Sequence, residues 1–321
     1  MDNLTHSLVG WTLGQAGLKR KTRKGLAALM LGANMPDIDV FFGQVPWEPL
    51  ATHRGFTHGL VGGVLLMPPM LAGLLWLLDR WQARRGAEFR SGLAMHFGWL
   101  VALSYLGTLT HPLLDWQTTY AVQLFSPFDS RWYHTDGLFI IDVWIWIGLA
   151  FAIWLSRRRE RRGEDWQKPP RAAFAVLVLY IVFNGALTAW AKNQVQMSEP
   201  YASPDAIFAS PPPAEFWKRE LVWRQRGMLA WGAYDPFVSL AGLGGNHTDP
   251  VPDGMTDPLV RQALAAPSMA SLARWSVLPF ARVERDGCDV RVIFGDARYG
   301  RTVAGNRFRR DVLISNAAAG C

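Results

Sequence analysis

Long apolar runs in the first 191 residues constrain the fold more than any other feature of this sequence. They cover residues 59–78, 93–109, 138–155 and 172–191. Each run holds about 17 to 20 mainly apolar residues, which as α-helix extend about 26–30 Å, the thickness of the hydrocarbon core of a bilayer. We therefore expect a polytopic helical membrane domain in this part of the chain.

The basic residues stand in short blocks beside these runs, at residues 19–24, 80–90 and 157–162. Short basic loops stay on the cytoplasmic side of a membrane. This placement accounts for the net charge of +7 without a nucleic-acid partner, and none is expected. With the blocks inside, the chain makes three helical hairpins, 5–18 with 25–42, 59–78 with 93–110, and 137–155 with 171–191. About six helices follow, with both termini outside the cytoplasm.

The composition changes after residue 191, where a Pro/Ser-rich stretch begins. We expect the membrane domain to occupy 1–192, a linker to occupy 193–213, and a soluble α+β domain to occupy 214–321. Turn signals at 224–227 and 286–287 predict two β-hairpins in that domain. Segments 257–265 and 268–275 are typical of short helices. The predicted fold class is mainly α, with about six helices in hairpins followed by a smaller α+β domain.

Six of the seven histidines precede residue 135, and most stand beside carboxylates. The predicted topology places these groups at the outer ends of the helices: His6; Asp37 and Asp39; His53 and His58; His111 and Asp115; His134 and Asp136. A polar side chain at a membrane interface is commonly a solvated cap. Five groups from separate segments on one face instead favour a shared metal site. His96, by contrast, is expected in the middle of a span, as a packing residue.

The mixture of imidazole and carboxylate without thiolate suits zinc, with manganese or iron as alternatives, and allows two ions. The predicted metal ligands are His6, Asp39, His53, His58, His111 and Asp115. His111 and Asp115 are four residues apart and so share a helical face. Asp37 is the predicted catalytic base. Arg54 is predicted to pair with a substrate phosphate, or alternatively with Asp37 or Asp39.

Four motifs in the first 140 residues carry a family resemblance. They are residues 3–6 with Gly10, residues 32–39, residues 53–58 (His-Arg-Gly-Phe-Thr-His) and residues 110–115 (Thr-His-Pro-Leu-Leu-Asp). In order and spacing they resemble the membrane-bound metal-dependent hydrolases of the YdjM/YbcI type. Residues 294–300 are similar to the soluble tail of longer members. The resemblance implies a hydrolase of the bacterial inner membrane.

A site at the membrane boundary favours a lipid or phosphoester substrate, and the topology places the C-terminal domain in the periplasm. Two other classes of function fit the same residues. A metal carrier or sensor would use the same ligands, although transport requires polar groups that continue across the bilayer. A non-enzymatic scaffold would bind a protein partner through its C-terminal domain.

Overall fold

A computed structural model describes residues 1–44, 53–198, 201–238, 247–286, 289–300 and 308–315. The chain forms two compact units. The first is helical and comprises most of the first 186 residues together with 213–216. The second comprises 187–212 and the residues from 217 onward, with most of the β-structure.

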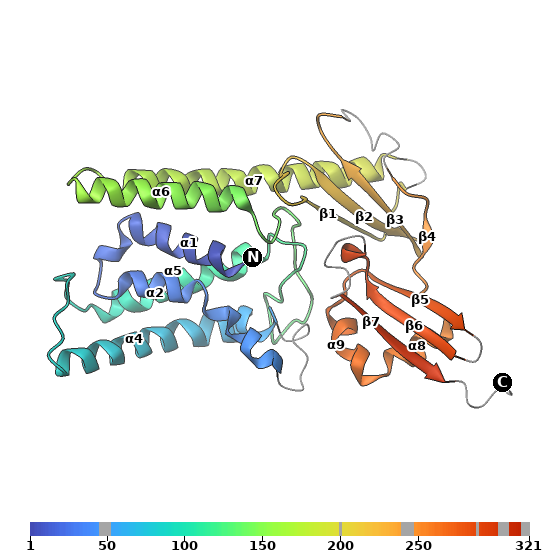
Figure 1. Cartoon of the computed structure of the whole chain (residues 1–321), viewed down its shortest axis with the longest axis horizontal. Coiled ribbons are helices and arrows are strands. Elements are labelled where there is room, and N and C mark those ends of the chain that lie inside the picture. Colours follow the sequence, from blue (N-terminus) through green and yellow to red (C-terminus); the bar gives the residue numbers. More distant parts are fainter. Residues whose placement is uncertain (45–52, 199–200, 239–246, 287–288, 301–307, 316–321) are drawn as a thin grey trace. The chain divides into compact units, whose positions relative to one another are not determined.

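The helical unit consists of helices that run side by side (Figure 1). Its elements are α1 (Asn3–Gln15), α2 (Gly25–Gly32), a 3-10 segment (Met35–Gln44), a 3-10 turn (Phe56–His58), a π-helical segment (Leu60–Leu66), α4 (Met67–Arg84), α5 (Phe97–Asp115), α6 (Val143–Arg161) and the first part of α7 (Lys168–Gln196). Within the described residues, three stretches are long and apolar enough to cross a membrane: Leu60–Arg84, Phe97–Asp115 and Lys168–Gln196.

The other three helices of the unit, among the about six expected, do not by themselves have the length and composition of membrane spans. α1 has 13 residues and α2 has eight, which corresponds to about 20 and 12 Å of helix, short of a 30 Å hydrocarbon core. α6 has 19 residues but ends in a run of arginines. The predicted span 25–42 stops as an α-helix at Gly32, and the chain continues as the 3-10 segment that carries Asp37.

Glycines allow α1, α2 and α5 to pack at backbone contact. A β-carbon at Gly10 of α1 would lie 2.7 Å from the carbonyl oxygen of Leu29 in α2, and one at Gly107 of α5 would lie 2.6 Å from the same oxygen. Small residues at helix crossings permit such close approach in membrane proteins. Around the crossing lies an apolar core, which includes Leu8, Leu13, Leu71, Leu75, Leu100 and Leu103. This packing brings the C-terminal end of α2 against the last turns of α5.

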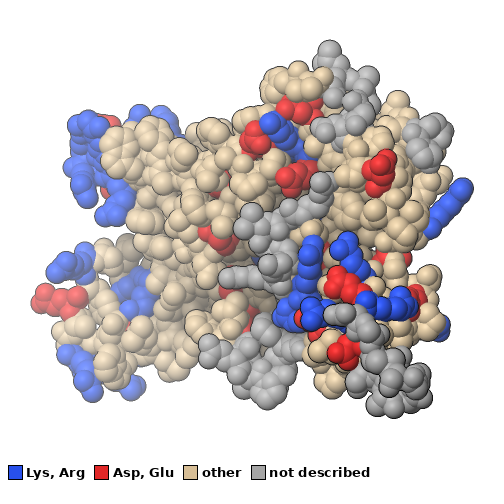
Figure 2. All heavy atoms as spheres, turned by 45° about the vertical axis from the view of Figure 1, so that its right-hand side comes forward, with Lys and Arg blue, Asp and Glu red and all other residues tan. Residues whose placement is uncertain are grey.

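The two ends of the helical unit differ in charge. The turns after α1, α4 and α6 lie at one end of the unit (Figure 1), and Lys and Arg side chains gather there (Figure 2). α5 begins near that end and runs 19 residues to Asp115, a rise of about 28 Å. The basic turns and the C-terminal end of α5 are therefore separated by about the thickness of a hydrocarbon core.

Prolines and one histidine occupy distinct positions in these helices. Pro68 and Pro69 occupy the first turn of α4, where a missing N–H costs no hydrogen bond. Pro112 lies inside α5, so His111 keeps a helical position. His96 lies exposed just before α5 begins, not in the middle of a span.

The C-terminal unit contains two antiparallel sheets. One has the order β1 (Ala206–Ser210), β2 (Arg219–Gln225), β3 (Met228–Tyr234), β4 (Val251–Pro252), and the other β5 (Pro279–Asp286), β6 (Asp289–Asp296), β7 (Arg309–Ser315). Helices α8 (Pro258–Leu264) and α9 (Pro267–Trp275) lie between them in sequence. Both predicted hairpins are present, β2 with β3 and β5 with β6. β1 and the end of α7 lie within 193–213, the segment expected to be a linker.

Candidate metal centre

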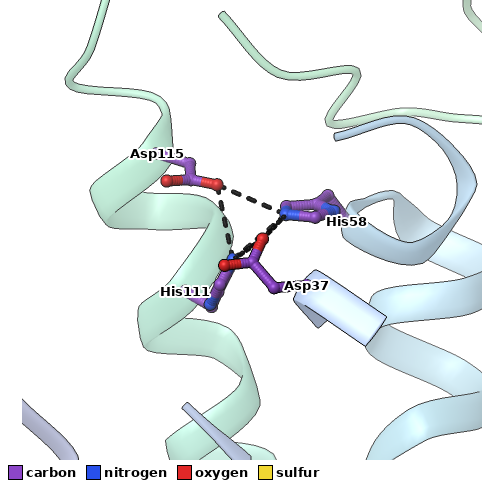
Figure 3. Close-up of side chains that lie close together, drawn as sticks. All are labelled: Asp37, His58, His111 and Asp115. Atoms are coloured by element: carbon purple, nitrogen blue, oxygen red, sulfur yellow. Dashed lines mark hydrogen bonds and ion pairs between the residues drawn. The ribbon is translucent and has the colours of Figure 1, made fainter. Parts of the chain in front are cut away.

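Four buried side chains converge at the end of the helical unit opposite the basic turns. α5 contributes His111 and Asp115, one helical turn apart. The 3-10 segment after α2 contributes Asp37, and the 3-10 turn before α4 contributes His58. One nitrogen or oxygen from each of the four lies within 4.8 Å of the others. Figure 3 shows the four side chains pointing toward one another from three separate elements.

The atoms that meet are the Nε2 atoms of both histidines and one oxygen of each carboxylate. His58 Nε2 lies 3.0 Å from His111 Nε2. Asp37 Oδ1 lies 3.4 Å from His58 Nε2 and 3.2 Å from His111 Nε2. Asp115 Oδ2 lies 3.3 and 3.4 Å from the same two nitrogens.

The tautomers of both histidines follow from their other ring nitrogens. His111 Nδ1 lies 2.6 Å from the carbonyl oxygen of Ala33, which can only accept, so Nδ1 carries the proton. His58 Nδ1 lies 3.0 Å from the hydroxyl of Thr57. That hydroxyl donates to Asp39 Oδ2 at 2.6 Å, so it accepts from His58. In the neutral rings both Nε2 atoms therefore present lone pairs to each other and to the carboxylates.

This donor set fits a metal ion. Two imidazole lone pairs and two carboxylate oxygens meet with no proton between them, and within the described residues Asp37 Oδ1 and Asp115 Oδ2 are buried without a hydrogen-bond partner. Buried acceptors in such an arrangement are stabilised by a cation placed between them. Zinc bonds of about 2.0–2.1 Å place tetrahedral ligands about 3.3–3.4 Å apart. The observed separations of 3.0–3.4 Å are close to this spacing.

Arg54 fixes the orientation of Asp115. Its guanidinium is buried, lies 3.1 Å from Asp115 Oδ1, and donates to the hydroxyl of Thr118 at 2.9 Å. It also lies over the ring of Tyr120. The α-amino nitrogen of Met1 contacts the same carboxylate oxygen. Positive charge on the Oδ1 side leaves Oδ2 directed at the two histidines. Arg54 thus pairs with Asp115, which is itself one of the predicted ligands.

Asp39 and His53 form a pair beside the four-residue group. His53 Nδ1 lies 2.8 Å from Asp39 Oδ1, and Asp39 Oδ2 accepts from the backbone N–H of Arg54. Burial lowers the pKa of His53, although Asp39 counteracts this. Burial would raise the pKa of Asp39, but hydrogen bonds and charge from His53 and His58 hold it below its usual range. Asp37, Asp39 and His53 make a second group able to hold an ion, with Asp37 shared between the groups.

Two predicted groups lie outside both metal-capable sets of the described residues. His6 stacks on His111, with ring centroids 3.7 Å apart, and its Nε2 lies 3.4 Å from Asp115 Oδ1. It therefore borders the site on the side of the oxygen that Arg54 contacts. His134 pairs with the buried Asp136 at 2.8 Å.

The outer contacts of the site were not predicted from the sequence. Thr57, Thr118 and the carbonyl of Ala33 each orient one of the site side chains. Thr57 lies inside the 53–58 motif and Thr118 lies three residues after Asp115. Their nearness in sequence to the expected ligands is the one feature that could have indicated these contacts. The Ala33 carbonyl offers no signal, because any residue has one.

Fold and site together define a class, that of helical membrane proteins with a buried histidine and carboxylate site able to hold a metal. The chain belongs to the YdjM inner membrane protein family, whose model matches residues 1–191. That range contains every residue of the candidate site. Among curated proteins and among solved structures, none matches the chain.

Proposed function

We propose that this protein is a membrane-bound metal-dependent hydrolase whose ion is held by Asp37, His58, His111 and Asp115. The observation that carries the proposal is the meeting of two Nε2 lone pairs and two carboxylate oxygens in a buried space. A bound divalent ion supplies Lewis acidity toward a phosphoryl or acyl oxygen and lowers the pKa of water. Zinc suits the ligand set, with manganese or iron as alternatives.

Asp39 and His53 are placed to handle the proton. Asp39 holds the Nδ1 side of the His53 ring, which leaves Nε2 able to accept, as in other carboxylate-oriented histidine bases. His53 is 21% exposed, whereas His58 and His111 are fully enclosed. Within the site, His53 is therefore the histidine that water and substrate can reach. Arg54 acts through Asp115, because its buried guanidinium is engaged there.

The position of the site supports a substrate at the membrane surface. The site lies about 28 Å along α5 from the basic end of the helical unit, and basic turns remain cytoplasmic. The site and the chain that follows α7 then face the periplasm. A carboxylic ester or phosphoester of a lipid, or of a lipid-linked compound, is the substrate class that this location favours.

The test uses full-length protein purified in detergent, with elemental analysis and assays on phosphomonoester, phosphodiester and carboxylic ester substrates. We expect bound metal and hydrolysis of at least one class, with both lost in His58→Ala and His111→Ala. His96→Ala is the matched control, because His96 lies exposed before the other end of α5, and it should keep both properties. Full metal content in the two site variants would refute the ligand assignment. Metal without hydrolysis of any class would favour the carrier or sensor reading.

A further inference from the structure

A groove lies between α1 and α6, at the basic end of the helical unit. It has a volume of about 530 Å³ and is lined by Leu8, Trp11, Ala150, Ile153, Trp154, Arg157, Arg158 and Arg161. The apolar residues lie on the side toward the middle of the helices, and the arginines follow toward the C-terminal end of α6. From Ala150 to Arg161 the helix rises about 17 Å, close to the roughly 15 Å of one bilayer leaflet.

The arginines that line the groove differ from their neighbours in their ion pairs. Arg159 and Arg162, outside the lining, each lie 3.9 Å from Glu164. The three lining arginines have no carboxylate partner among the described residues. Two of the three lie near aromatic rings of the groove: the Arg157 guanidinium lies 5.6 Å from the Trp11 ring centre and that of Arg158 lies 5.6 Å from the Trp154 ring centre.

We propose that this groove binds one anionic phospholipid, with an acyl chain along the α1/α6 surface and the phosphate against Arg157, Arg158 and Arg161. The charge complementarity is direct, because unpaired guanidinium groups are strong phosphate donors. The order of apolar and basic residues along the helix matches the order of chain and headgroup in one leaflet. Basic pockets between helices at the cytoplasmic surface are known to recognise lipid headgroups. If these arginines served only to keep the loop on the cytoplasmic side, positive charge near the membrane would be enough. That role explains neither the groove nor the difference in ion pairs between the lining arginines and their neighbours.

The experiment titrates full-length protein in neutral detergent with dioleoyl phosphatidylglycerol and counts bound lipid by native mass spectrometry. Dioleoyl phosphatidylcholine, which has the same chains and no net charge, is the comparison lipid. Glycerol 1-phosphate tests the anionic group without chains. The key variant is R157Q/R161Q, and the matched control is R159Q/R162Q, which removes the same charge from the same block outside the groove. Ala150→Trp fills the apolar part and leaves every arginine in place.

We expect one tightly bound phosphatidylglycerol in the wild type and in R159Q/R162Q, with phosphatidylcholine and glycerol 1-phosphate much weaker. Affinity should fall roughly 30-fold in R157Q/R161Q, from about tenfold per 1.4 kcal/mol and about 1 kcal/mol for each arginine. It should also fall in Ala150→Trp. Equal weakening in the two double variants would show a general effect of surface charge and overturn the proposal. Equal binding of the two lipids, or unchanged affinity in both R157Q/R161Q and Ala150→Trp, would overturn it as well.

Discussion

Replacing Asp37 with asparagine should change stability in opposite directions with and without metal. In the absence of an ion, the carboxylate of Asp37 faces the lone pairs of His58 and His111 and lies near Asp115. An asparagine of the same shape removes one negative charge and offers an N–H donor to these acceptors. The metal-free variant should therefore be more stable than the metal-free wild type.

The size of this effect follows from the separation of the two carboxylates. One oxygen of each carboxylate lies within 4.8 Å of the other, and two unit charges at that separation repel by about 3.5 kcal/mol at an effective dielectric constant of about 20. The positive charge of Arg54 beside Asp115 reduces this, so the net gain should be about 1–2 kcal/mol. At about 2–4 °C per kcal/mol for a unit of this size, the midpoint should rise by about 2–8 °C. With zinc at about 1,000 times its Kd, the wild type gains about 4 kcal/mol, and the variant loses most of that gain.

The assay is thermal unfolding of detergent-purified protein with chelator and with excess zinc. Asp39→Asn is the control, because Asp39 accepts from Thr57 and the Arg54 backbone and contacts His53. Asparagine there loses hydrogen bonds and should lower the midpoint in both conditions. If Asp37→Asn also lowers the midpoint in chelator, Asp37 is a structural hydrogen-bonding residue and the converging-acceptor account is wrong.

Three further outcomes test other parts of the account. Gly107→Ala should lower the free energy of unfolding, measured by denaturant titration, by about 1–3 kcal/mol through overpacking, because its β-carbon would lie 2.6 Å from a backbone oxygen. Gly98→Ala is the control on the same helix and should be neutral, because its β-carbon would have no atom within 4 Å. Asp296→Asn should destabilise the C-terminal unit by about 3–5 kcal/mol at pH 7 by removing the buried carboxylate that pairs with Arg298, seen as faster hydrogen exchange in β5 and β6. Burial would raise the pKa of Asp296, but Arg298 and donated hydrogen bonds hold it below its ordinary value. The stability that comes from this depressed pKa is complete above about pH 4, the pKa of the unfolded state, and declines as the pH falls through the folded pKa. The wild type should therefore lose protection from hydrogen exchange as the pH falls through that range, and the variant should not. An alkaline phosphatase fused at the C-terminus should be active, and a silent fusion with an active cytoplasmic reporter would reverse the topology.

The sequence predicted the parts of the fold and site that depend on local pattern. The i, i+4 spacing placed His111 and Asp115 on one face of α5, and turn residues located the hairpin between β2 and β3. Apolar length predicted membrane spans in the segments that contain α4, α5 and α7, and within the described residues all three have the length and composition of membrane spans.

The division of roles between Asp37 and Asp39 could not be read from the sequence. It depends on the chain leaving α2 at Gly32 and continuing as a 3-10 segment, which directs Asp37 toward α5 and Asp39 toward the 53–58 turn. The sequence spacing to that turn suggested Asp39 as a ligand; the structure places Asp37 in the four-residue group and Asp39 with Asp37 and His53 in the second group. The position of His6 likewise depends on the glycine-mediated contact between α1 and α2, which sets how α1 packs beside the site.

X-ray absorption at the metal edge of the zinc-loaded protein tests the central claim most directly. The account predicts a single tightly bound ion, or two if the Asp37, Asp39 and His53 group is also filled. The spectrum should show imidazole scattering from two histidines and nitrogen and oxygen ligands at about 2.0–2.1 Å. His111→Ala should remove one imidazole contribution or the ion itself. A spectrum of oxygen ligands alone, identical in the wild type and His111→Ala, would contradict the assignment of this site.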